Sequence, residues 1–236
     1  MPSLQMYRFI LMEFFSYPLF HFIIGVSLLY YIISTYASPF TCAYLDNNPN
    51  IAQSVTDNPL LIYLISSFSA TFVFGDNLER KKVIFFHASP LSKNKIFFIL
   101  LIGGLTISYL TGIVLYVLAL LFLHPQIFVI SIISIKFLTF VISLLLFLTM
   151  PYMIGVIISI ISKRSSISFF VSFIASLLIY GNIAYTYKLM MPYYTTNIMV
   201  QIKTLYDIFL FYRDALIGSI LLVVVSYIIW MRWCDV

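Results

Sequence analysis

Six long apolar stretches constrain the fold of this chain more than any other feature. They are Tyr17–Tyr36, Pro59–Phe74, Ile96–Leu123, Phe137–Ile161, Ile167–Tyr187 and Ala215–Met231. Only 9% of the 236 residues are charged, whereas a soluble domain carries about 25%. A helix of about 20 apolar residues crosses the hydrocarbon core of a bilayer, and it pairs its own backbone polar groups there. The sequence therefore predicts an all-α integral membrane protein with six spans, forming one domain over residues 1–236.

The basic residues predict the orientation of these spans. If both termini lie inside, nine Lys and Arg residues fall on the inner side and three on the outer side. Inner loops are enriched in Lys and Arg, so we expect both termini in the cytoplasm. Cys42 and Cys234 then lie on opposite faces of the membrane, too far apart for a disulfide, and two cysteines are too few for a metal site. Topology accounts for the positive charge, and no nucleic-acid partner is expected.

A charged segment separates the second and third apolar stretches. Residues Gly75–Lys95 hold five of the 13 Lys and Arg residues. The pair Ser89-Pro90 fits the start of a new helix, because serine caps free N–H groups and proline is favoured at the first helical position. We expect a short helix along the inner face that transmits force from a soluble partner. The alternative is a cytoplasmic loop whose basic residues serve only topology.

The run His87-Ala88-Ser89-Pro90-Leu91-Ser92-Lys93, preceded by the acidic Glu79, resembles the first inner loop of type-2 ABC exporter permeases. Those proteins carry an acidic residue and, further on, a small residue followed by Ser-Pro-Leu-Ser and a basic residue entering the third span. Six spans, cytoplasmic termini and a similar length also match. Lys82-Val83-Ile84 stands where many members have a Gly-Thr-rich stretch.

The resemblance implies that residues 79–90 are a coupling helix that binds a separate ABC ATPase subunit. The implied contact residues are Glu79, Arg80, Lys81, Lys82, Phe85, Phe86, Ser89 and Pro90, with the two phenylalanines as apolar anchors. ATP and Mg would bind the partner ATPase, and this chain would carry no cofactor and no catalytic residue. A second permease copy or a homologous permease would complete a dimer in the plasma membrane of a prokaryotic cell.

Polar residues recur at helical spacing along the fifth span, at Ser165, Ser168, Ser172, Ser176 and Tyr180. One interpretation is a translocation path, lined also by Ser66 and Ser69 of the second stretch, as the second and fifth spans line one in the resembling family. The other is close helix packing, which needs small side chains at this spacing. Gly104 in the third stretch points to packing alone.

Two further segments are expected to form amphipathic helices. Pro2–Phe15 predicts a helix in the inner interface or an extension of the first span. Asn197–Tyr212 predicts an outer helix between the fifth and sixth spans, either near the exit of the path or without a role in transport.

Apart from boundary positions, the six stretches contain no Asp, Glu, Lys, Arg or His. Ion-coupled transporters and intramembrane hydrolases need such groups within the membrane, so we expect neither. We expect ATP-driven export of a hydrophobic, lipid-like or amphipathic substrate. The alternative is a non-transporting scaffold or assembly factor whose basic loop binds anionic lipid.

Overall fold

The computed structural model of the chain describes residues 2–16, 21, 24–26, 29, 59–80, 91–123, 135–190 and 198–233. Every regular element in this part is a helix, and the same residues contain no strand. The predicted all-α class is therefore confirmed. Most of the first predicted span, together with Cys42 and Cys234, lies outside the described residues.

The second predicted span is a continuous helical rod, Pro59–Glu79, built from three pieces. They are α5 (Pro59–Ala70), the π-helix η1 (Thr71–Asp76) and α6 (Asn77–Glu79). Pro59 stands at the first helical position, where its missing N–H leaves no hydrogen bond unmade. The rod passes the predicted end at Phe74, and Asn77 Nδ2 donates a 2.6 Å hydrogen bond to the Val73 carbonyl in this extension.

Helices also cover the next three predicted spans. They are α8 (Lys93–Leu123), α10 (Ile135–Ser162) and α11 (Ser165–Met190). The last element, α12 (Ile198–Trp233), is one helix of 36 residues. The prediction of an outer helix separate from the sixth span was wrong, since both segments belong to α12. No glycine or proline lies between Ile198 and Gly218 to interrupt the backbone hydrogen bonds of the helix.

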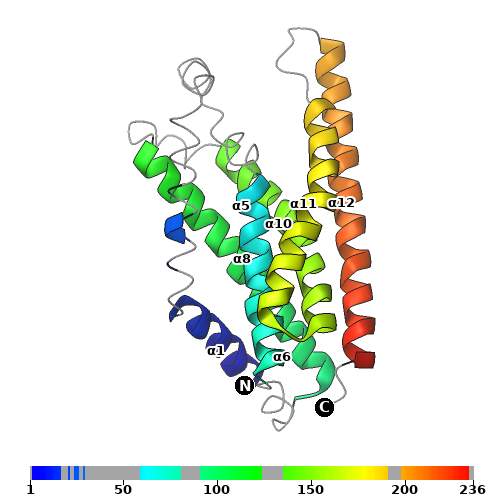
Figure 1. Ribbon diagram of the computed structural model, residues 1–236. Coiled ribbons are helices and arrows are strands. Elements are labelled where there is room, and N and C mark those ends of the chain that lie inside the picture. Colours follow the sequence, from blue (N-terminus) through cyan, green and yellow to red (C-terminus); the bar gives the residue numbers. More distant parts are fainter. Residues whose placement is uncertain are drawn as a thin grey trace.

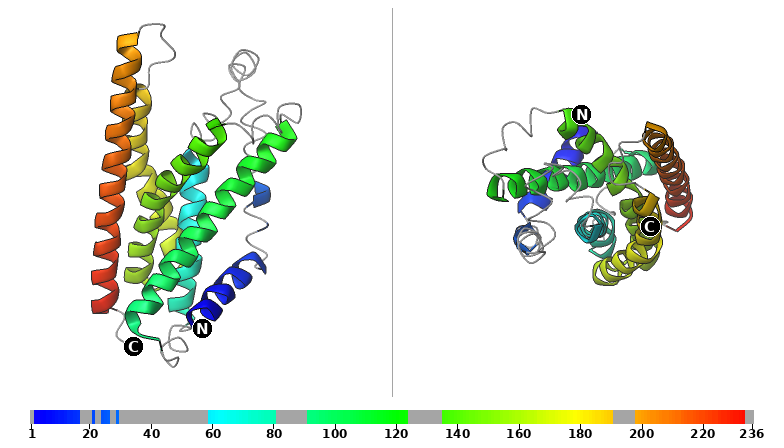
Figure 2. Two further views of the ribbon diagram at one scale, coloured as in Figure 1. Left: turned by 180° about the vertical axis from the view of Figure 1, so that it is seen from behind. Right: turned by 90° about the horizontal axis from the view of Figure 1, so that it is seen from above.

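Helix α10 is the centre of the bundle and packs against α5, α8, α11 and α12. Figures 1 and 2 show these helices running side by side, with α8 crossing them at an angle. Glycines allow three of the contacts to be close, since a Cβ atom on any of them would collide with the neighbouring helix. It would lie 2.0 Å from Tyr152 Oη at Gly104, 2.7 Å from the Ala70 Cβ at Gly155, and 2.8 Å from the Met150 Cε at Gly218. The packing role predicted for Gly104 is confirmed.

The predicted N-terminal helix is present as α1 (Pro2–Ser16), which packs against α8. Its buried side chains are Met6, Ile10 and Phe14. The Phe14 ring meets Phe72 of the rod edge-on, with centroids 5.0 Å apart. Because of these contacts α1 is a fixed part of the bundle.

The start of α1, the short helix α6 and the C-terminal end of α12 lie at the same end of the molecule (Figure 1). The buried Trp230 of α12 contacts Phe74 and Phe97 at this end, with ring centroids 5.9 and 5.8 Å apart. Lys93 Nζ, at the start of α8, donates a 3.0 Å hydrogen bond to the Met231 carbonyl. Aromatic and polar contacts thus join three helices here.

Within the described residues, one helix segment has both the length and the apolar composition to cross a membrane, Lys93–Leu115 of α8. Shorter apolar segments lie in α10, α11 and α12, at Leu148–Ser162, Ser165–Leu178 and Leu216–Arg232. A single helix of this kind also occurs in the cores of soluble proteins, so the six-span topology stays a prediction.

Candidate functional site

The end of the bundle that carries α6 contains the first two residues of the predicted coupling helix. Glu79 and Arg80 lie within the charged segment and are its last described residues before Leu91, and Glu79 ends the rod. Both therefore stand at the end of the rod, whereas the sequence predicts them at the start of a separate short helix. Lys81, Lys82, Phe85, Phe86, Ser89 and Pro90 lie outside the described residues.

The rod changes its helical winding just before this end. The π-helix η1 covers Thr71–Asp76, and its residues Thr71–Gly75 are buried. Such wide turns are rare and are found frequently at functional sites. The π-helix lies between the apolar helix α5 and the charged residues that follow Gly75.

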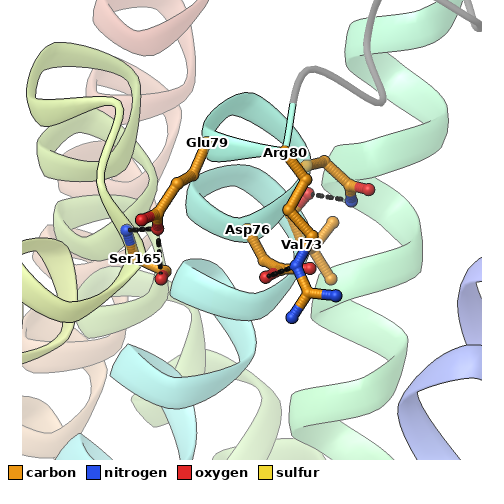
Figure 3. Close-up of polar contacts among 6 residues, drawn as sticks. Val73, Asp76, Glu79, Arg80 and Ser165 are labelled. Atoms are coloured by element: carbon orange, nitrogen blue, oxygen red, sulfur yellow. Dashed lines mark hydrogen bonds and ion pairs between the residues drawn. The ribbon is translucent and has the colours of Figure 1, made fainter.

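Arg80 and Glu79 turn to different partners (Figure 3). Arg80 Nε lies 2.7 Å from Asp76 Oδ1, one turn earlier in the rod. Glu79 reaches the neighbouring helix, where its Oε2 accepts a 2.7 Å hydrogen bond from the Ser165 backbone N–H and a second hydrogen bond from the Ser165 hydroxyl. We call this contact the Glu79–Ser165 clasp.

The clasp places a carboxylate at the N-terminus of α11. The first N–H groups of a helix have no partner within the helix, and the helix dipole favours negative charge there. The hydroxyl and then the backbone N–H of Ser165 are the main causes that lower the pKa of Glu79 below its ordinary value, with smaller effects from Arg164 and Arg80. The charged form of Glu79 is therefore the form that holds α11.

A two-residue turn, Lys163-Arg164, presents Ser165 to Glu79. Lys163 has a φ of 52°, the left-handed conformation that a residue with a side chain rarely adopts. The Ser162 and Ser168 hydroxyls lie 2.6 Å apart, and the Ser168 N–H donates a 3.0 Å hydrogen bond to the Arg164 carbonyl. The turn is thus held by its own polar contacts.

Gly75 brings the two backbones together beside the clasp. A Cβ atom on Gly75 would lie 3.2 Å from the Ser165 Cα and 3.5 Å from the Ser168 Oγ. A larger residue here would push the rod away from α11. Gly75 is not among the predicted site residues. The sequence identifies Ser165 as the first serine of the polar stripe along the fifth span, but it does not predict the contact with Glu79.

The chain restarts its helix later than the sequence predicts. The start was placed at Ser89-Pro90, but Leu91 and Ser92 are not helical and α8 begins at Lys93. The Ser92 carbonyl accepts the 3.1 Å hydrogen bond from the Ile96 N–H that opens this helix. The start of α8 is therefore close to the first residue of the apolar run, Ile96, and the Ser89-Pro90 pair precedes the helix.

The predicted path residues lie at helix contacts within the chain. Ser66, Ser69, Ser168, Ser172 and Ser176 are all fully buried. The side chain of Tyr180 lies outside the described residues.

These serines stand where α5, α10 and α11 meet. Gly155 of α10 faces Ser67 of α5 and Ser172 of α11, with a Cβ on Gly155 lying 3.7 Å from an atom of each. Ser66 Oγ donates a 3.3 Å hydrogen bond to the Leu148 carbonyl of α10. This arrangement favours the packing interpretation for one chain, and a path between two chains stays a prediction.

Neither a metal-binding cluster in the described residues nor a similarity to known proteins indicates a further site. No group of three or more His, Cys, Asp or Glu side chains that could hold a metal ion occurs in the described part of the chain. No protein-family model matches the sequence, and comparisons with curated proteins and with solved structures find no significant match.

Proposed function

We propose that this chain is the membrane subunit of an ATP-driven ABC exporter and that residues 79–90, the coupling segment, bind a separate ATPase subunit. One observation carries the proposal. The described chain stops at Arg80, the residue that caps α6, and resumes at Leu91, two residues before α8. Lys93 of α8 donates a hydrogen bond to the Met231 carbonyl of α12, and α6 lies at the same end of the bundle as the start of α1 and the C-terminal end of α12 (Figure 1). A soluble subunit bound there would act on the rod and on α8 together.

Exposed apolar faces support the membrane location. On α11 the exposed side chains include Ile167, Phe170, Ile174 and Leu178, which share one face. A soluble protein rarely leaves so large an apolar surface in water, whereas lipid covers it without cost. Helices α10, α11 and α12 have 28, 26 and 36 residues, and about 20 are enough to cross the hydrocarbon core. With the rod, α8 and residues 17–36 they make the six proposed spans.

The chemistry of the spans supports the substrate class. The apolar stretches contain no Asp, Glu, Lys, Arg or His away from their ends, and in α12 the residues Lys203, Asp207, Arg213 and Asp214 precede its apolar segment Leu216–Arg232. A charged substrate would therefore have no counter-charge within these stretches. A hydrophobic, lipid-like or amphipathic substrate fits this interior. ATP binding and hydrolysis on the partner subunit would bias the equilibrium between inward and outward states of a permease dimer.

The test is co-purification of the chain with an ABC ATPase from the same genome. Phe85→Asp together with Phe86→Asp should abolish the complex, because charge removes the two apolar anchors. Phe85→Leu with Phe86→Leu is the matched control and should keep it. The proposal fails if the ATPase stays bound to the double Asp variant.

A scaffold that binds anionic lipid is the second candidate, and exposed cations favour it. The exposed cations are Lys95 near the start of α8, Arg164 just before α11 and Arg232 near the end of α12. These helix ends lie at the end of the bundle that carries α6 (Figure 1). Cations at the cytoplasmic leaflet attract anionic headgroups. Stimulation of an ATPase by the purified chain separates the two functions, since a scaffold would stimulate none.

A further inference from the structure

The rod and α11 are in close contact at the Glu79–Ser165 clasp and at Gly75. One turn before Glu79 in the rod, Gly75 lets the rod backbone approach Ser165 and the Ser168 hydroxyl. Further along, Ala70 of the rod and Ser172 of α11 both lie against Gly155 of α10. The rod therefore approaches the α11 backbone closely at Gly75, and the clasp lies one turn further on at Glu79.

Two independent features tie the helices at this end. One is a pair of hydrogen bonds from α11 to a carboxylate of the rod, and the other is the backbone contact at Gly75. The tie involves the last residue of α6 and the first residue of α11. Any displacement of Glu79 is thus applied directly to the N-terminus of α11.

We propose that the rod and α11 move as a single lever, in which the clasp carries a displacement of the coupling segment to α11. The inference rests on the proposed function, which supplies the force. Close-packed elements transmit displacement because they deform little. The outward apolar face of α11, with Phe170 and Ile174 exposed, would then move with the ATPase-bound segment. Glu79 and Gly75 act as positioning residues in this scheme.

A reversible covalent tie tests the lever. Glu79→Cys and Ser165→Cys are combined in a background with Cys42→Ser and Cys234→Ser. The reduced double variant lacks the clasp, and mild oxidation replaces it with a disulfide. We expect oxidation to raise the stimulation of the partner ATPase by about fivefold or more, the lower end of couplings between sites. Equal or lower stimulation by the cross-linked protein overturns the lever.

A wedge at Gly75 gives a second test that leaves the coupling segment unchanged. Gly75→Leu should separate the rod from α11 while the ATPase stays bound, so that binding is kept and stimulation falls. Ser166→Ala is the matched control, since Ser166 is exposed beside the clasp, and it should change neither. Full stimulation by a folded Gly75→Leu variant contradicts the lever.

The two proposals fail in different ways. If the unsubstituted chain binds and stimulates no ATPase, the proposed function fails and the lever with it. If that chain stimulates an ATPase but the oxidised pair does not exceed the reduced pair, only the lever fails.

Discussion

Tyr152 of α10 is packed against α8 with almost no free space. Its hydroxyl donates a 3.3 Å hydrogen bond to the Leu101 carbonyl, and its ring lies over Gly104. The side chain is fully buried. A rigid aromatic ring in this position cannot yield as a flexible side chain would, so Gly104 is the residue that permits the contact.

Gly104→Ala should therefore destabilise the protein by about 1–3 kcal/mol, the usual cost of overpacking a core. The new Cβ would lie 2.0 Å from Tyr152 Oη. Gly103→Ala is the control, because its Cβ would meet Ile10 at 3.5 Å, an ordinary contact. Thermal unfolding in detergent measures the difference. A Gly104→Ala variant as stable as Gly103→Ala contradicts the packing argument.

At the scale of elements, the clasp joins α6 to α11 through a charged group. The pKa of Glu79 is lowered by Ser165, so folding favours the ionised carboxylate. The stabilisation is present above the ordinary pKa of 4.5 and is lost as the pH falls through the lowered value in the folded chain.

The expected result is a pH-dependent difference in thermal stability between the unsubstituted chain and Glu79→Gln. The difference should favour Glu79 at neutral pH and disappear in acid, since Gln cannot ionise. Melting the two proteins in parallel between about pH 6 and pH 3 covers the relevant window. A difference that stays constant over this window would show that the Glu79 charge does not hold α11.

At the scale of the whole molecule, both described ends of the chain lie together. Ser3 of α1 and Arg232 of α12 are exposed and belong to the end of the bundle that carries Glu79. Lys203 stands near the other end of α12, about 44 Å along the helix from Arg232 at 1.5 Å per residue. If the bundle spans a membrane, Ser3 and Arg232 share one side and Lys203 is on the other.

Single cysteines test this topology in intact cells. Ser3→Cys and Arg232→Cys, each without the two native cysteines, should react with a membrane-impermeant maleimide only after lysis. Lys203→Cys should react before lysis. If Ser3→Cys and Arg232→Cys label on different sides, both the topology and the site of the proposed ATPase contact are wrong.

The residues that sequence analysis identified at the site were those with a local signal. A charged segment between apolar stretches points to Glu79 and Arg80 because charge within such a sequence is conspicuous. The helical spacing of the serines points to Ser165 but not to its partner Glu79, and no local pattern points to Gly75. Both residues act through a contact with a residue distant in the chain. The outer helix was separated from the sixth span because amphipathic and uniformly apolar patterns differ, although both patterns are helical and nothing in the sequence breaks α12.

The sequence by itself determined the helical class and the approximate position of the helices after the first span, because an apolar chain must pair its backbone groups locally. Only the tertiary structure decided which helices touch. Tyr152 on Gly104, Gly155 on Ala70 and Glu79 on Ser165 are contacts between residues far apart in the chain. Local backbone hydrogen bonding determines that a segment is helical. The fit of side chains between helices determines which helices pack together, and no single segment of the sequence contains the information for that fit.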